Sequence, residues 1–163
     1  DHFDPRTNSI SLSDSVYGST SVAAIGVAAH ESGHAVQYAE GYAPLKFRNA
    51  IVPVTQFGAK LSTPLVILGL ILSIYPLAYA GIILFGAVVV FQLVTLPTEF
   101  NASRRALAVL EEGNYLDGEE LRGAKKVLSA AAMTYVAALF MSLMSLLRLI
   151  VIVSGSKNSR NRR

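Results

Sequence analysis

No charged side chain occurs between Leu61 and Thr98. This run is longer than the roughly 20 residues that one helix needs to cross a bilayer. The pair Tyr75 and Pro76 lies near its middle, and proline removes a backbone donor and clashes with the preceding helical turn. We therefore expect two membrane helices, at residues 51–74 and 77–96, that form a hairpin turning near Tyr75 and Pro76.

A second charge-free segment lies between Lys126 and Arg148 and is rich in small residues, which let membrane helices pack closely. The chain is 52% hydrophobic and 15% charged, whereas soluble domains are roughly 25% charged. We therefore predict a mainly α-helical integral membrane protein. A single long buried helix in a soluble protein is disfavoured, because 163 residues are too few to enclose it.

The polar N-terminal part contains one short predicted strand and one predicted helix. Residues 9–13 alternate polar and apolar side chains, which is the period of a half-buried strand, and we expect an exposed edge strand there. Residues 20–40 predict a helix that Ser19 or Thr20 caps at its start. Gly41 is the expected C-terminal stop of this helix.

A second polar part follows the predicted hairpin. Residues 99–112 predict a helix that ends at Gly113. Asp117, with Glu120 three residues later, has the form of a capping box at the start of the next helix. Residues 116–118 also resemble the L-D-G ligand motif of intramembrane site-2-type proteases, but they lie in a polar stretch. A capping role for Asp117 explains its position better.

The pattern H-E-x-x-H occurs once, at His30, Glu31 and His34, within the first predicted helix. Residues four apart lie on one face of a helix, one turn apart, so both imidazoles can bind one zinc ion. Glu31 is rotated by about 100° from His30 and can reach a water molecule on the metal, whose pKa zinc lowers toward about 7. The pattern therefore predicts two zinc ligands and a general base.

Histidine and cysteine usage supports a zinc site at this motif. The chain has three histidines, two of them inside the motif, and no cysteine, so a transition-metal site must use His, Asp or Glu. The motif lies in a helix of otherwise small and apolar residues, where polar groups are costly without partners. Ordinary surface histidines are the less favoured interpretation.

A catalytic zinc ion needs a third protein ligand and one open coordination position. Glu99 is the first charged residue after the second apolar span, and a membrane hairpin returns it to the side that holds His30 and His34. A helix N-terminal glutamate that interacts with the helix dipole is a compatible alternative role. His2 is the competing ligand, although it lies at a chain end with no supporting pattern.

Four segments resemble the YugP-like neutral zinc metallopeptidases of bacteria: residues 1–6 (DHFDPR), 10–13 (ISLS), 27–37 (VAAHESGHAVQ) and 96–103 (LPTEFNAS). The resemblance covers nearly the whole chain. This family normally has one more N-terminal membrane segment, so we expect the chain to be part of a longer protein.

The arrangement is also similar to the HtpX and Ste24-type membrane peptidases, which are gluzincins. That similarity implies that His30, His34 and Glu99 bind one Zn²⁺ per chain and that Glu31 is the general base. Those relatives commonly carry an aspartate four residues after the glutamate ligand, where this chain has Ser103. Asn101 or Ser103 is therefore expected to orient the zinc-bound histidines, without the charge of an aspartate.

Substrate binding and transition-state stabilisation also have candidate residues. An edge strand beside the zinc helix can pair with an extended substrate through main-chain hydrogen bonds. The candidates in this strand are Ile10, Ser11, Leu12 and Ser13. A donor for the developing oxyanion is also expected, and the candidates are Tyr17, Tyr38, Tyr115, Arg104 and Arg105.

We expect five segments along the chain. Residues 1–50 form a catalytic part with the edge strand and the H-E-x-x-H helix, and residues 51–97 form the transmembrane hairpin. Residues 98–126 form a catalytic part with the third zinc ligand, residues 127–153 a transmembrane helix, and residues 154–163 a basic tail.

Basic residues near the ends of the spans predict that the active site faces the cytoplasm of a bacterial cell membrane. They are Lys46, Arg48, Arg104, Arg105, Arg122, Lys125 and Lys126. The basic tail then lies outside if the last helix crosses, which the same rule disfavours. The alternative is that the last helix does not cross completely.

The sequence thus predicts a zinc-dependent membrane endopeptidase that acts on protein or peptide substrates in or near the membrane. The alternative is a non-catalytic, zinc-stabilised membrane scaffold or interaction protein, and the presence of Glu31 favours the enzyme. The net charge of +3 and the basic tail suit anionic lipid. No motif or basic stripe indicates nucleic-acid binding.

Overall fold

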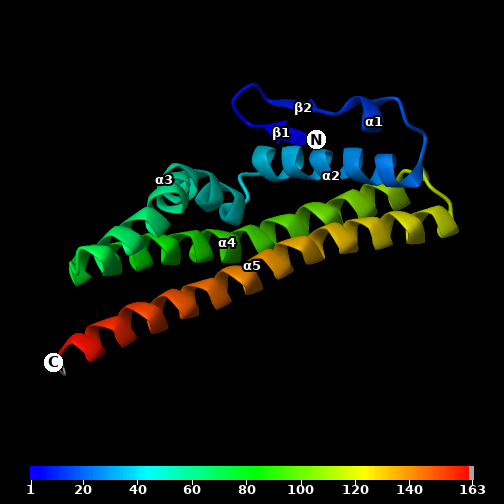
Figure 1. The fold of residues 1–163 in the computed structure, drawn as a ribbon. Coiled ribbons are helices and arrows are strands. Elements are labelled where there is room, and N and C mark those ends of the chain that lie inside the picture. The colour runs from blue at the N-terminus through cyan, green and yellow to red at the C-terminus, as the bar shows by residue number, and fades with distance from the viewer. Residues whose placement is uncertain (162–163) are drawn as a thin grey trace. The chain divides into compact units, whose positions relative to one another are not determined.

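The computed structural model describes residues 1–161, with side chains through Asn158, so the predicted basic tail lies partly outside the described residues. The described part is mainly α-helical with a short two-stranded sheet, which confirms the predicted fold class (Figure 1). The elements are β1 (His2–Asp4), β2 (Ser9–Ser11), α1 (Asp14–Tyr17), α2 (Val22–Ala39), α3 (Ala43–Ile71), α4 (Tyr75–Glu112) and α5 (Gly118–Asn161). They divide into two compact units.

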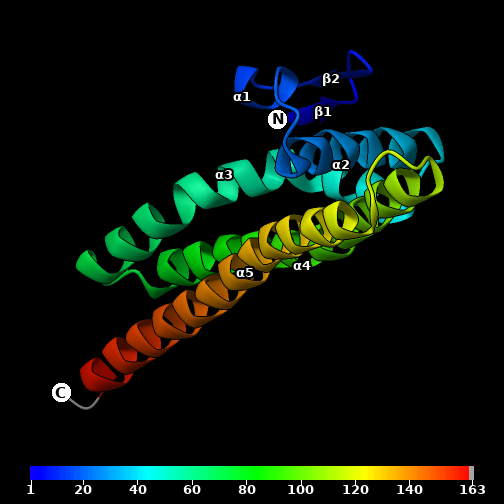
Figure 2. The same cartoon turned by 90° about the vertical axis from the view of Figure 1, so that its right-hand side faces the viewer.

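The first unit contains Asp1–Phe47 and Thr95–Tyr135. Its strands form an antiparallel hairpin in which Phe3 pairs with Ile10, and β1 lies between β2 and α2 in both views (Figures 1 and 2). The sequence predicted one strand and missed β1. The observed β2 ends at Ser11, so the strand is shorter than the predicted segment of residues 9–13.

The N-cap of α2 lies one or two residues after the predicted caps. Ser21 is its N-cap, and its side chain accepts a hydrogen bond from the backbone N–H of Ala24 at 3.2 Å. Ser19 supports this cap, because its hydroxyl oxygen accepts from the Ser21 backbone N–H. Gly41 follows the helix with a φ of +68°, a left-handed conformation that glycine adopts readily. The predicted stop is therefore confirmed.

Helix α4 is one continuous helix of 38 residues, whereas the sequence predicted two helices with a break near residue 97. Pro97 lies inside it. An interior proline costs about 3 kcal/mol, which the backbone hydrogen bonds and packing of such a long helix outweigh. Pro76 is in the first turn of α4, where a missing N–H breaks no intrahelical bond. The turn before it includes Ser73, whose φ is +60°.

The start of α5 confirms the predicted capping box. One carboxylate oxygen of Asp117 accepts from the backbone N–H groups of Glu119 and Glu120, each at 2.9 Å. The Glu120 carboxylate accepts in return from the Asp117 backbone N–H at 3.0 Å. Asp117 therefore caps a helix, as expected from its polar surroundings.

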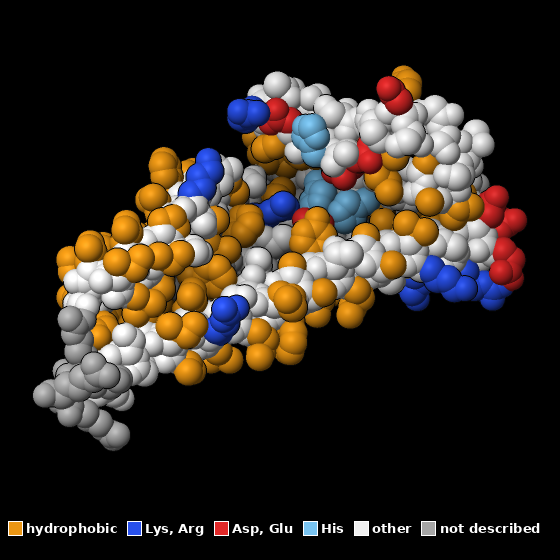
Figure 3. All heavy atoms as spheres, in the orientation of Figure 1, with side chains coloured by type: hydrophobic (Ala, Val, Ile, Leu, Met, Phe, Trp, Pro, Cys, Tyr) orange, Lys and Arg blue, Asp and Glu red, His pale blue; other side chains and the backbone are white. Residues whose placement is uncertain are grey.

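The second unit contains Arg48–Val94 and the part of α5 from Val136 onward. Its helices pack closely at small residues: a Cβ atom on Gly69 would lie 2.4 Å from the Ala78 backbone nitrogen. Val66 and Val153 belong to its buried core. Apolar side chains cover much of its visible surface (Figure 3). Helices α3, α4 and α5 are each long and apolar enough to cross a membrane.

Candidate metal centre

The first unit brings together the three predicted zinc ligands from two helices. His30 and His34 lie on successive turns of α2, with ring centroids 4.7 Å apart, and Glu99 comes from α4. The Glu99 carboxylate oxygen Oε2 lies 3.2 Å from His30 Nε2 and 3.6 Å from His34 Nε2. One potential ligand atom from each residue lies within 4.8 Å of the other two.

These spacings fit a zinc ion. Two nitrogen or oxygen ligands about 2.1 Å from a tetrahedral zinc ion are about 3.4 Å apart, between the two distances measured from Glu99. The carboxylate of Glu99 is almost fully buried, with 3% of the residue exposed. A buried carboxylate requires a positive or hydrogen-bonding partner, which two imidazoles or a cation provide. The donor set of two nitrogens and one oxygen leaves a fourth position for water or substrate.

The electrostatic surroundings raise the pKa of His34 above its usual value near 6.5. Burial by itself lowers this pKa, because it disfavours the charged imidazolium. Burial is the largest single influence on this pKa, but Glu99, Gln37 and Glu31 together outweigh it. A metal ion that binds here therefore competes with a proton for His34.

Each histidine has a second polar partner away from Glu99. His30 Nδ1 lies 3.1 Å from the Ser103 hydroxyl, as expected for a residue that orients a ligand. His34 Nδ1 lies 2.9 Å from Gln37 Oε1, a partner that the sequence analysis missed. Gln37 could have been predicted from its position three residues after His34 on the same helix, because side chains at this spacing are neighbours. Asn101 contacts Gln37 and Arg105 rather than a histidine.

A cavity of about 220 Å³ opens beside these residues. Glu31 and His30 line it from α2, and Glu99 and Ser103 line it from α4. The wall that α5 contributes is largely apolar and consists of Leu128, Ala131, Ala132 and Tyr135. The motif glutamate and two of the predicted ligands, His30 and Glu99, therefore face one space that is large enough for a side chain.

Comparison with known proteins identifies the family. Residues 1–154 match the family described as "Putative neutral zinc metallopeptidase". The chain belongs to this family. It is also 47% identical over 158 residues to the "Putative membrane protease YugP" of Bacillus subtilis (strain 168), an alignment that covers 97% of this chain and 70% of that relative. No solved structure matches the chain significantly.

Membership of this family implies zinc, and the residue group that fits an ion is the predicted one. Among the described residues, His30, His34 and Glu99 form the group of three potential ligands. His2, the competing ligand, is exposed in β1 and is not part of it.

None of the five predicted oxyanion donors lines the metal-side cavity. Tyr17 is 82% exposed, Tyr38 packs against Phe3, and Arg105 pairs with Glu40 at 2.6 Å. Tyr135 lines the cavity instead. No sequence signal pointed to Tyr135, because it lies in an apolar segment assigned to a membrane helix.

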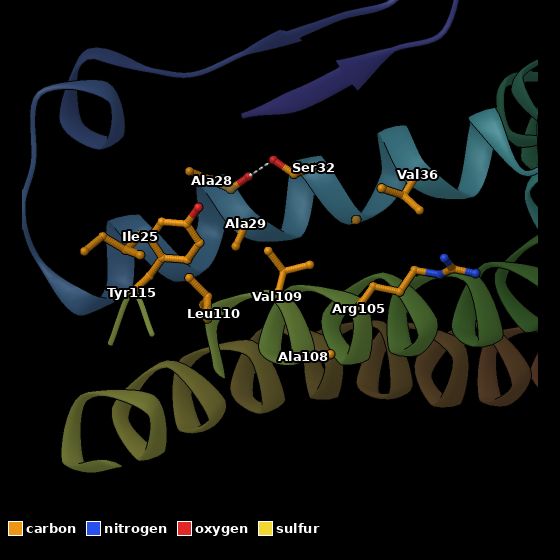
Figure 4. A pocket seen from close by; sticks show the side chains of 11 residues that line it. Ile25, Ala28, Ala29, Ser32, Val36, Arg105, Ala108, Val109, Leu110 and Tyr115 are labelled. Carbon is orange, nitrogen blue, oxygen red and sulfur yellow. Dashed lines mark hydrogen bonds between the residues drawn. The ribbon is translucent and has the colours of Figure 1, made fainter. Parts of the chain in front are cut away.

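A second, larger cavity of about 670 Å³ lies along another face of α2 (Figure 4). Ile25 and Val36 line it from α2, Val109 and Leu110 from α4, and Tyr115 from the following loop. In Figure 4 the Ser32 hydroxyl donates to the Ala28 carbonyl oxygen within α2. This cavity is apolar and contains none of the predicted zinc ligands, so it belongs to a surface distinct from the metal centre.

Proposed function

We propose that the chain is a zinc-dependent membrane endopeptidase in which His30, His34 and Glu99 bind one zinc ion. The observation that supports this most strongly is the convergence of Glu99 on the two motif histidines. Glu99 is 65 or more positions away from either histidine in the sequence. Its carboxylate oxygen Oε2 nevertheless lies 3.2 Å from His30 Nε2 and 3.6 Å from His34 Nε2. An accidental H-E-x-x-H pattern does not require a third ligand at this place.

The residues around the cavity have complementary roles in peptide hydrolysis. Zinc, when bound, lowers the pKa of water and polarises a carbonyl group. Glu31 lines the cavity and acts as the general base that takes the proton of the attacking water. It then returns that proton to the leaving amine. Ser103 and Gln37 hold the imidazoles in position.

The walls of the cavity indicate the substrate class. An extended peptide pairs with the edge strand near residues 10–13, as proposed from the sequence. That strand does not line the metal-side cavity, so another part of the peptide places one side chain in the space beside Glu31. Leu128 and Ala131 give this space an apolar wall, which favours an apolar side chain. Three candidate spans in the same chain favour substrates in or near the membrane. The basic residues near the spans favour a site that faces the cytoplasm.

Zinc content separates this proposal from its alternatives. We expect about one zinc per chain in the purified protein, loss of zinc in His34→Ala and Glu99→Ala, and retention in His2→Ala. Glu31→Gln should keep the metal and lose cleavage of a membrane-protein substrate. Retained cleavage in Glu31→Gln removes the proposed general base.

Two other outcomes of these measurements contradict the proposed peptidase. Zinc binding without any cleavage by the unaltered protein favours the zinc-stabilised scaffold. A protein that binds no zinc after reconstitution is neither the proposed peptidase nor that scaffold.

A further inference from the structure

A chain of buried and partly buried hydrogen bonds runs from His34 to Arg105, which forms a surface ion pair with Glu40. Gln37 has no exposed surface. Its Oε1 lies 2.9 Å from His34 Nδ1, and its Nε2 donates to the Thr98 carbonyl at 2.8 Å and to Asn101 Oδ1 at 2.9 Å. Arg105 Nε donates to the same Asn101 oxygen at 2.8 Å. Donor and acceptor roles along this chain can be assigned from chemistry alone.

The assignment starts at Arg105, because a guanidinium group only donates. The Asn101 atom that faces it must therefore be the oxygen. That oxygen and the Thr98 carbonyl oxygen are both acceptors, so the Gln37 atom that faces them must be the NH₂ group. An amide that was flipped by 180° would place its oxygen against the Thr98 and Asn101 oxygens, and such a contact between acceptors is costly.

The remaining Gln37 atom, Oε1, faces His34 and can only accept. His34 Nδ1 must then carry a hydrogen. In the neutral imidazole the other nitrogen, Nε2, is therefore unprotonated, and this nitrogen faces Glu99. We propose that Gln37 is a positioning residue that fixes His34 as the Nδ1–H tautomer, with Nε2 ready to bind zinc, and that Asn101 and Arg105 fix the orientation of the Gln37 amide.

His30 has no such constraint. Its Nδ1 partner is the Ser103 hydroxyl, which can donate or accept and so fits either tautomer. Glu99 Oε2 also lies within hydrogen-bond distance of His30 Nε2, at 3.2 Å, whereas His34 Nε2 is farther away at 3.6 Å. The carboxylate therefore favours a hydrogen on His30 Nε2 more than one on His34 Nε2. The two imidazoles therefore have different hydrogen-bond partners. His30 serves as the reference histidine whose signals a change at Gln37 should leave unaltered.

This inference rests on the proposed zinc site for its function, but the tautomer is measurable without zinc. Protein labelled with ¹⁵N on histidine and freed of metal in detergent micelles is followed over a pH series, so that the neutral form of each imidazole is read from its own ring signals. The chain has three histidines, so the ring signals can be assigned with single variants. We expect His34 to carry its proton on Nδ1. A neutral His34 ring that carries its proton on Nε2 overturns the proposal, whether or not the protein binds zinc.

Gln37→Met keeps a side chain of similar size and removes the acceptor. We expect the His34 Nδ1–H signal to be lost or to exchange faster with water, the His30 signals to stay, and zinc affinity to fall about 10–100-fold. Arg104→Gln, at the exposed neighbour of Arg105, is the control and should change neither. Unchanged His34 signals and zinc affinity in Gln37→Met contradict the proposal.

If Gln37→Met does not fold, Asn101→Ala takes its place at a less buried position. It removes one of the two acceptors that orient the Gln37 amide, and Thr98 retains the other. The His34 Nδ1 hydrogen should then exchange faster than in the unaltered protein and in Arg104→Gln. Equal exchange in all three proteins excludes Asn101 and Arg105 from the positioning chain.

Discussion

A Cβ atom on Gly33 of α2 would lie 2.5 Å from the carbonyl oxygen of Ala102 in α4. Such a contact is far inside van der Waals distance, so α2 approaches α4 this closely because position 33 has no side chain. Gly33 immediately precedes His34, and Ala102 lies three residues after Glu99. The glycine therefore sets the separation between the helix that supplies the histidines and the helix that supplies the carboxylate.

Gly33→Ala should push the two helices apart. The methyl group meets backbone rather than a flexible side chain, and overpacking of this kind costs about 1–3 kcal/mol. We expect weaker zinc binding and a lower unfolding temperature, measured by chelator competition and by thermal denaturation. Gly86→Ala is the control, because a Cβ atom there meets nothing within 4 Å. Equal zinc affinity in Gly33→Ala and the unaltered protein would show that the close approach is unimportant for the site.

Ile10→Pro tests the proposed substrate strand. Proline removes a backbone N–H from β2, so pairing with an extended peptide should fail while His30, His34 and Glu99 stay in place. We expect cleavage to be abolished and zinc content to stay at the level of the unaltered protein. Ile10→Thr keeps both the N–H and a β-branched side chain and should remain active. Normal cleavage by Ile10→Pro excludes the strand from substrate binding.

Ala131→Phe tests the apolar wall of the metal-side cavity. Ala131 is exposed and lines the cavity, so a phenyl ring has room to enter the space proposed for a substrate side chain. We expect cleavage of substrates with a large apolar residue to fall about tenfold or more, with zinc content unchanged. Met133→Phe adds a ring at an exposed α5 position that does not line the cavity. Equal losses in the two variants would argue against a substrate subsite.

The ion pair between Glu40 and Arg105 predicts a specific pH dependence of stability. Hydrogen bonding to the Arg105 side chain lowers the pKa of Glu40 below its usual 4.5. A lowered carboxylate pKa stabilises the folded state above the usual pKa, and the effect is lost as the pH falls through the lowered value. Glu40→Gln should therefore lower the unfolding temperature slightly at pH 7, and the difference should vanish in acid.

The control for this pH series is Glu112→Gln, which removes the same charge at an exposed position in α4. It should show no comparable pH-dependent difference from the unaltered protein. A Glu40→Gln difference that persists unchanged well below pH 4.5 must come from something other than the ion pair.

The sequence placed His30, His34 and Glu99 in one group, and the structure brings these three residues together. The spacing of His30 and His34 follows from helix geometry, and Glu99 is the first charge after the apolar hairpin. Gln37 and Tyr135 were missed for opposite reasons. Gln37 had a local signal that was not used, its position three residues after His34 on one helix, whereas Tyr135 reaches the cavity only because α5 packs beside α4 in this unit.

Element boundaries were less predictable where long helices override local signals. The end of the charge-free run led to two predicted helices, at residues 77–96 and 99–112, but they form one continuous helix that tolerates the missing hydrogen bond at Pro97. The strand β1 was missed because three residues do not establish a period of two. In contrast, the Asp117 capping box depends on side chains within one turn, and it formed as expected.

The contacts between α2 and α4 also have a consequence for how this unit opens. Ser103, Asn101 and Arg105 of α4 each bond to a side chain of α2 or to its C-cap, and Gly33 lies directly against Ala102. Neither helix can detach without breaking all of these contacts together. The amide hydrogens of α2 and of the facing segment of α4 should therefore exchange with deuterium as one cooperative group, and bound metal should slow both to the same extent.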